Sequence, residues 1–296
     1  MNAFISLVEP MAAAEQPPAN VQHVHLVDEM FEAVAARRFG VDFQPIVGAD
    51  DSLLAWRAKA RFVGADGRRL SPTAVFATLH RNPALLLATE LQLKSLALAN
   101  APADGWLLLP LDADSYAAAG SGSVGGGSVS GAGNAFDLLF GGQQRLIVEV
   151  CENRPATDVA RLHLLLRGLA AQGIPLAVGN RTPVTACLIE TLHEADWLRV
   201  PCPQELRESR HIRTLENIAE SARQAGSIAF VSDVRSAETL AIVRAIGFSG
   251  ACGPVFEGCV DSSTCWAQAG QERGFIAAHE ERRTHGGYAM QSGAHS

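Results

Sequence analysis

Charged residues and long apolar runs are both scarce in this sequence. Asp, Glu, Lys and Arg make up 19% of the 296 residues, and the formal net charge is −7 at pH 7. Nonspecific affinity for nucleic acid comes from clustered Lys and Arg, so this composition argues against a general nucleic-acid-binding surface. We expect no membrane span, because no apolar run approaches the ~20 residues that cross a bilayer.

A secretory signal and metal-binding cysteine motifs are also missing. The N-terminus has no basic region, and Glu9 and Pro10 interrupt its apolar stretch, so we expect a cytoplasmic protein. The six cysteines form no C-x-x-C pair and have no His at zinc spacing, which indicates small buried hydrophobes and no metal ion or cofactor. These cysteines are Cys151, Cys187, Cys202, Cys252, Cys259 and Cys265. We expect surface or packing roles for His23, His25, His80, His163, His193 and His211.

Apolar residues are plentiful, at 48% of the chain, and they follow a repeating pattern. Short apolar runs alternate with longer amphipathic segments, which is typical of strands joined by crossover helices. Eight such runs predict an α/β protein with a TIM-like (β/α)8 barrel as one main domain. The predicted strands are Asp42–Ile46, Leu54–Phe62, Trp106–Leu111, Leu146–Val150, Pro175–Val178, Trp197–Val200, Ile228–Val231 and Gly250–Pro254. The predicted helices are Leu26–Arg38, Pro72–His80, Ala84–Asn100, Thr157–Ala171, Val184–Leu192, His211–Ala225 and Ala237–Ile246.

We expect the barrel to occupy residues 23–266, between a flexible lead (1–22) and a flexible tail (267–296). Residues 120–134 are almost entirely Gly, Ser, Ala and Val, so they predict a flexible loop after the third strand. No Lys-Ser or Lys-Thr follows this stretch, and we expect no helix to open directly from it, which argues against a phosphate-binding loop.

Three segments together resemble the EAL domain, the barrel of the bacterial cyclic-di-GMP phosphodiesterases. The sequence FQPIV at residues 43–47 is similar to the start of that domain, and LIVEVCE at residues 146–152 looks like its L-x-x-E-I-T-E strand. Residues 234–258 resemble its V-E-T helix, its Gly turn at Gly247 and its final strand in length. The resemblance covers residues 41–260 and implies an EAL-type barrel with one antiparallel strand.

The resemblance also implies that most of the family's metal-binding residues are replaced. The name-giving Glu-Ala-Leu falls on Arg57, Ala58 and Lys59, whereas the motif's closing arginine is kept as Arg61 and the strand glutamate as Glu149. The family's metal-binding Asn falls on Pro110, its Asp pair on Ala177 and Val178, and its catalytic Lys on Arg199. Its two later Glu residues fall on Ser232 and Arg235, and the Gln of its last strand falls on Cys252. Because two divalent cations need converging oxygen ligands, we expect no hydrolysis by the family mechanism.

Two interpretations of the arginines stay open. If the alignment holds, Arg57, Arg61, Arg199 and Arg235 point to the C-terminal mouth of the barrel. They could neutralise leftover acids, with a direct ion pair between Arg57 and Glu149, and this is the favoured interpretation. Alternatively they bind an anion such as cyclic-di-GMP without metal. The candidate ligand-binding residues are Gln44, Arg57, Arg61, Glu149, Arg199 and Arg235.

The functional expectation is therefore a catalytically inactive, EAL-like regulatory module that binds an unidentified protein partner, with a homodimer as a possibility. A metal-independent cyclic-di-GMP sensor is the alternative. An active phosphodiesterase is a third reading, in which Glu149 works with Asp196 or Asp233.

Overall fold

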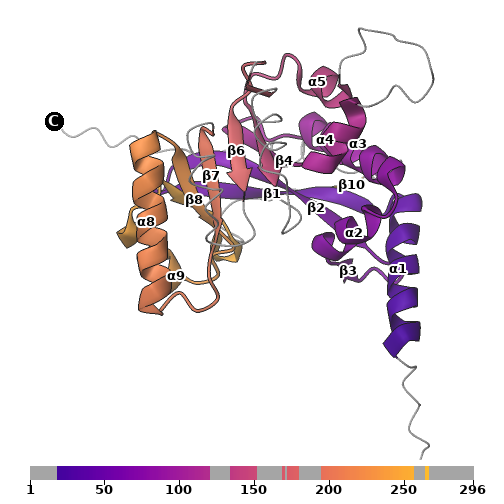
Figure 1. Ribbon diagram of the computed structural model, residues 1–296, viewed down its shortest axis with the longest axis horizontal. Coiled ribbons are helices and arrows are strands. Elements are labelled where there is room, and N and C mark those ends of the chain that lie inside the picture. Colours follow the sequence, from indigo (N-terminus) through magenta and orange to yellow (C-terminus); the bar gives the residue numbers. More distant parts are fainter. Residues whose placement is uncertain are drawn as a thin grey trace, which may run out of the picture.

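The computed structural model describes residues 19–120, 134–151, 169–170, 172–179, 195–256 and 264–266, and their strands form a closed barrel. Eight strands close it in the order β1-β9-β8-β7-β6-β5-β4-β2, with β2 pairing back to β1. The predicted TIM-like barrel is thus confirmed (Figure 1). The barrel strands are β1 (Phe39–Gly48), β2 (Leu53–Val63), β4 (Trp106–Asp112), β5 (Leu146–Cys151), β6 (Leu176–Gly179), β7 (Trp197–Pro201), β8 (Ile228–Ser232) and β9 (Gly250–Ala251).

The first strand is the antiparallel member that the sequence predicts. β1 runs antiparallel to both β2 and β9, whereas every other pairing around the barrel is parallel. A tight turn joins β1 to β2, where Asp51 adopts a left-handed φ of 65° and Asp50 accepts a hydrogen bond from the Ser52 amide at 3.1 Å. Asp tolerates both roles better than most residues, which explains why the chain reverses here. Two short strands extend the sheet, β3 (Arg69–Leu70) beside β2 and β10 (Thr264–Trp266) beside β1.

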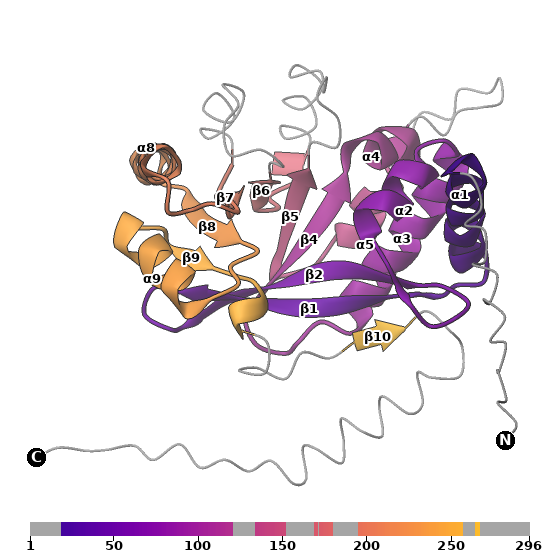
Figure 2. The same ribbon diagram turned by 90° about the horizontal axis from the view of Figure 1, so that it is seen from below.

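The described helices form two groups on opposite sides of the barrel (Figures 1 and 2). One group lies near β2 and β4: α1 (Ala19–Ala35), α2 (Pro72–Leu79), α3 (Pro83–Ala99), α4 (Ala113–Gly120) and α5 (Ala135–Phe140). The other lies near β8 and β9: α8 (Ser209–Ala225) and α9 (Ala237–Ile246). None of the described helices is long and apolar enough to span a membrane.

Alternation along the strands divides the buried residues between two cores. Successive strand residues point to opposite faces, so one set fills the barrel and the other packs under the helices. The larger core includes Trp56, Leu109 and Val148, all at most 4% exposed. The barrel interior is a separate layer of small and large side chains that fill it without a channel. It consists of Ile46, Ala55, Leu108, Ile147, Ala177, Trp197, Phe230 and Cys252.

Several predicted boundaries are wrong. The helix expected from Leu26 begins at Ala19, so residues 19–22 of the predicted lead are helical. The eighth strand ends at Ala251, because Pro254, which cannot donate to a sheet ladder, starts the 3-10 helix η2 (Pro254–Phe256). A helix does open from the Gly-rich stretch, since Asn134 caps α5 by accepting from the Phe136 amide at 2.9 Å.

Other predictions correspond closely or lie outside the described residues. Helix α9 spans the predicted range, and α2, α3 and α8 differ by one or two residues at their ends. The elements α4, α5, β3 and β10 were not predicted from the sequence. Most of the predicted helices at residues 157–171 and 184–192, most of the 120–134 loop and the 267–296 tail lie outside the described residues.

Candidate functional site

At the C-terminal mouth of the barrel lie the inward-pointing side chains that follow the interior layer along the strands. Arg57, Glu149 and Arg199 each follow an interior residue of their own strand by two positions. Since strand side chains repeat with a period of two, all three point into the barrel, from β2, β5 and β7. The fold thereby brings together residues that are far apart in the sequence.

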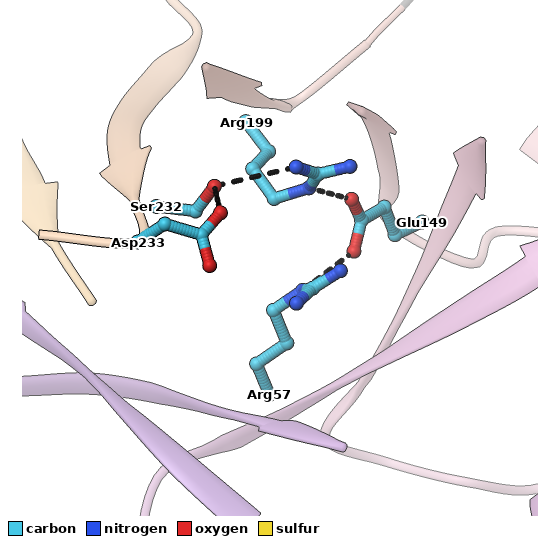
Figure 3. Close-up of polar contacts among 5 residues, drawn as sticks. All are labelled: Arg57, Glu149, Arg199, Ser232 and Asp233. Carbon is cyan, nitrogen blue, oxygen red and sulfur yellow. Dashed lines mark hydrogen bonds and ion pairs between the residues drawn. The ribbon is translucent and has the colours of Figure 1, made fainter. Parts of the chain in front are cut away.

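These three residues form a buried ion-pair triad, Arg57–Glu149–Arg199 (Figure 3). Arg57 Nε donates to Glu149 Oε2 at 2.9 Å, and Arg199 Nε donates to Glu149 Oε1. The Glu149 side chain is fully buried, and the arginine side chains are 14% and 10% exposed. The predicted Arg57–Glu149 ion pair is confirmed, and Arg199 joins it.

Ser232 and Asp233 continue this network at the end of β8 (Figure 3). Arg199 Nη1 donates to Ser232 Oγ at 3.3 Å, and Ser232 Oγ donates to Asp233 Oδ2 at 3.0 Å. Ser232 is buried, whereas Asp233 is exposed and has a left-handed φ of 64°. Arg199 is thus held from two sides, by a carboxylate and by a hydroxyl group.

Gly179, at the end of β6, makes room for the triad. A Cβ atom at this position would clash with Glu149 Oε1 and would lie 2.8 Å from Arg199 Nη2. Sequence reasoning missed this residue. The available signal was the strand period, because Gly179 lies two positions after the interior residue Ala177.

The triad sets the ionisation state of Glu149. Burial alone raises the pKa of a carboxyl group, but the charges of Arg199 and Arg57 and their hydrogen bonds outweigh burial here. The pKa of Glu149 is therefore lowered from 4.5 to about 2. The carboxylate stays ionised at neutral pH, paired with guanidinium groups.

The residues at the mouth do not fit the two divalent cations that an EAL-type fold implies. Magnesium needs oxygen ligands at about 2.0–2.1 Å, and manganese likewise prefers oxygen ligands, whereas both oxygens of Glu149 already face guanidinium nitrogens. A dication about 4 Å from either arginine would be repelled by about 8 kcal/mol at an effective dielectric constant near 20. Two such repulsions cancel the attraction of about 16 kcal/mol that one carboxylate exerts on a dication at about 2.1 Å, so no net attraction is left to hold the ion.

The other positions carried over from the resemblance are dispersed. Ala177 and Cys252 lie in the interior layer, and burial raises the pKa of the Cys252 thiol to about 11. Val178 packs in the larger core outside the barrel. Pro110 lies beside Glu149 in the β4–β5 pairing, just past the point where the β2–β4 ladder ends at Leu108.

The remaining predicted ligand-binding residues lie around the triad rather than in it. Gln44 is half-buried on β1 and pairs directly with Arg57 of β2, on the same face of the hairpin. Arg61 forms an ion pair with Asp42, with 3.5 Å between Nη1 and Oδ1. Arg235 is exposed in the segment between β8 and α9.

A cavity of about 390 Å³ opens where β2 and β4 separate beyond the ladder. Phe76 and Leu93 are among its apolar lining residues. Its charged lining residues are Arg57, Lys59, Lys94, Glu90, Asp112 and Asp233. Pro110 has no N–H to donate, which is consistent with the end of the ladder here. The cavity adjoins the triad because Arg57 belongs to both.

The two aspartates weighed as alternative metal ligands do not join Glu149. Asp196 lies just before β7, and its Oδ2 accepts from the Leu176 amide at 2.9 Å at the opposite end of the barrel. Asp233 is separated from Glu149 by Arg199 and Ser232 (Figure 3). Neither forms a carboxylate pair with Glu149 in the part of the chain that the structure describes.

Solved structures with this fold are EAL domains. The YkuI protein of Bacillus subtilis, solved with cyclic-di-GMP and calcium, has a TM-score of 0.62 and 17% identity over 88% of this chain, which spans 64% of the length of YkuI. The phosphodiesterase PaMucR in complex with cyclic-di-GMP has a TM-score of 0.60 and 16% identity, covering 82% of this chain and 98% of PaMucR. An EAL domain protein of Listeria monocytogenes has a TM-score of 0.60 and 13% identity, covering 84% of this chain and 97% of its own.

These similarities show that the chain has the EAL-type fold. No protein-family model matches the sequence, and no curated protein matches it significantly.

We predict that Glu149→Gln lowers the free energy of unfolding by about 3–5 kcal/mol, because it leaves two buried guanidinium groups without a counter-charge. The matched control is Glu220→Gln, which removes an exposed ion pair with Arg223 and should cost less than about 1 kcal/mol. Urea unfolding followed by circular dichroism measures both. Equal losses in the two variants would show that the triad does not stabilise the fold.

Stability should also fall at acid pH through the same carboxyl group. Its pKa is about 2 in the folded chain against 4.5 for the unconstrained group, so the unfolded state binds more protons between these values. The stabilisation is complete above about pH 4.5 and is lost as the pH falls towards 2, by about 3 kcal/mol in total. Urea midpoints across this range should fall more steeply for the natural protein than for Glu149→Gln, and parallel curves would contradict the assignment.

Proposed function

We propose that this chain is a non-hydrolysing EAL-type domain that acts by binding, in signalling that involves cyclic-di-GMP. The observation that carries the proposal is the occupation of both Glu149 oxygens by Arg57 and Arg199. Metal-assisted hydrolysis of a phosphodiester needs a cation-bound water and charge compensation at the phosphate. A carboxylate that is already held by two guanidinium groups supplies neither.

The link to cyclic-di-GMP signalling rests on the fold. YkuI and PaMucR have the same fold and were solved with cyclic-di-GMP. At 16–17% identity this likeness supports a related ligand or pathway without carrying over their chemistry. A domain that keeps the scaffold and loses the ligands of the metals exerts its effect through contacts. We therefore propose an unidentified regulatory protein as the partner, with a homodimer as a further possibility.

A second candidate function is binding of cyclic-di-GMP itself without metal. The observation that favours it is the charge of the triad, two positive against one negative, beside a cavity of 390 Å³. On the cavity lining, Arg57, Lys59 and Lys94 are matched by Glu90, Asp112 and Asp233, so the excess of positive charge lies at the triad. Guanidinium groups suit phosphate oxygens because they donate two parallel hydrogen bonds. Gln44 beside Arg57 offers a polar group for a base edge.

The proposed function predicts no turnover of cyclic-di-GMP. The full chain, incubated with cyclic-di-GMP and either Mn²⁺ or Mg²⁺, should yield no linear dinucleotide above the level of a protein-free sample. PaMucR in the same buffers serves as the positive control, since it is a phosphodiesterase of the same fold. The proposal would be refuted if linear dinucleotide forms and still forms after the protein has been purified by a second route. That result would support an active phosphodiesterase instead.

Calorimetry tests the second candidate separately. If the mouth binds cyclic-di-GMP without metal, titration should give the same affinity in EDTA and in Mg²⁺, and Lys59→Ala should weaken binding by about tenfold through loss of one charge-assisted contact. Arg207→Ala, which removes an exposed arginine paired with Glu238, is the control and should leave affinity unchanged. An absence of heat at high micromolar cyclic-di-GMP would eliminate this candidate and leave the protein-binding function.

A further inference from the structure

A second polar cluster lies apart from the triad and consists of His80, Asp112 and Asp114. His80 caps the C-terminus of α2, Asp112 ends β4, and Asp114 lies in the first turn of α4. One ligand atom from each residue lies within 4.8 Å of the other two. The expectation of a surface or packing role for His80 overlooked this arrangement, because the sequence separates His80 from the two aspartates.

The cluster is largely removed from solvent. The side chains of Asp112 and His80 are 5% and 11% exposed, and Asp114 closes the outer side at 43%. His80 Nε2 lies 3.1 Å from Asp112 Oδ2, whereas Asp114 Oδ2 lies 3.5 Å from the other ring nitrogen, Nδ1. A single ion binds only one ring nitrogen, and with one ligand atom from each residue the three atoms lie within 4.8 Å of one another. Such a mixed set of one imidazole and two carboxylates suits zinc and similar divalent ions.

The approach of His80 to Asp112 is not that of a hydrogen bond. Nε2 is fully buried and makes no hydrogen bond, although Asp112 Oδ2 lies 3.1 Å away. The oxygen therefore lies out of line with the direction in which the ring nitrogen donates or accepts. Two ligands of one ion show a similar relation, because tetrahedral bonds of about 2.0–2.2 Å place neighbouring ligand atoms about 3.3–3.6 Å apart while both point at the ion.

Helix α4 fixes the orientation of the Asp112 carboxylate. Asp112 Oδ1 accepts hydrogen bonds from the backbone amides of Asp114 and Ser115, at 3.0 Å each. This is the geometry of an N-cap, and it turns the other oxygen, Oδ2, towards His80. A carboxylate held in this way needs little reorganisation to bind a cation.

The neighbouring helix α3 adds no net positive charge beside this cluster. The buried Lys94 lies 2.6 Å from Glu90 Oε2 and is paired with it, and Glu90 in turn accepts the backbone N–H of Asp112. With a neutral imidazole, the three side chains of the cluster carry two negative charges. A divalent cation balances them.

We propose that His80, Asp112 and Asp114 bind one divalent transition-metal ion of the zinc class. The ion joins the end of α2 to the junction of β4 and α4, and so fastens the helical group at this end of the barrel. The site shares no residue with the triad, although Asp112 and Arg57 both line the cavity of 390 Å³. It can therefore be tested without reference to turnover or to nucleotide binding.

The test is metal binding by the full chain, stripped with EDTA and titrated with Zn²⁺ by calorimetry and with Co²⁺ by visible absorption. We expect one ion per chain, a Co²⁺ spectrum of nitrogen and oxygen ligation, and a rise in melting temperature with the ion present. No uptake of either ion would overturn the proposal.

Variants locate the ion. His80→Gln should weaken binding by at least about 100-fold, and Asp114→Asn by at least about tenfold, whereas His211→Gln, a histidine on α8, should change nothing. Asp114→Asn keeps the test decisive if His80→Gln fails to fold, because Asp114 is partly exposed. Unchanged affinity in Asp114→Asn, or a Co²⁺ spectrum of thiolate ligation, would place the ion elsewhere and refute the site.

Discussion

The buried carboxylate of Glu149 is the constraint on which the mouth of the barrel depends. An ionised carboxylate in a barrel interior costs several kcal/mol unless it is paired and hydrogen-bonded. Arg57 and Arg199 offset that cost by taking one oxygen each, and both guanidinium groups are themselves nearly buried and need the same carboxylate. Loss of Glu149 would remove the charge partner that both guanidinium groups share, and loss of either arginine would leave one Glu149 oxygen without that guanidinium group, so the three residues depend on one another.

This unit also determines which backbone can surround it. Gly179 has to lack a side chain, because a Cβ there would occupy the space between Glu149 and Arg199. On the other side, the β2–β4 ladder ends at Arg57 and Leu108, and Pro110 follows without an N–H to extend it. The strands separate at that point, and the resulting cavity brings solvent access and apolar surface next to a cationic group. The proposed binding function rests on this arrangement of a cationic group beside an apolar cavity.

The sequence predicted the strands well because their apolar runs are fixed by burial on both faces. It predicted the ends of some elements poorly, such as the start of α1 at Ala19 and the change from strand to 3-10 helix before Pro254. Caps and local turns leave weaker signals in a sequence than periodicity does. At the site, the Arg57–Glu149 pair was predicted from the positions that the resemblance assigns to the two residues, and the structure has it. The exposure of Arg235 could not be predicted, because it depends on the path of the chain after β8. Gly179 and His80 escaped notice because their importance comes from neighbours that are distant in sequence.

Charge balance distinguishes the two polar clusters of the barrel. In the triad the protein supplies its own cations, so the carboxylate is satisfied by covalently attached groups and an added dication would meet repulsion. At His80 the two aspartates outnumber the cations among the three side chains, whether the imidazole is neutral or protonated. A helix cap nevertheless keeps Asp112 oriented towards the ring rather than towards solvent. The same physical rule, that a buried carboxylate must be compensated, thus excludes a metal ion at the mouth and favours one beside α4.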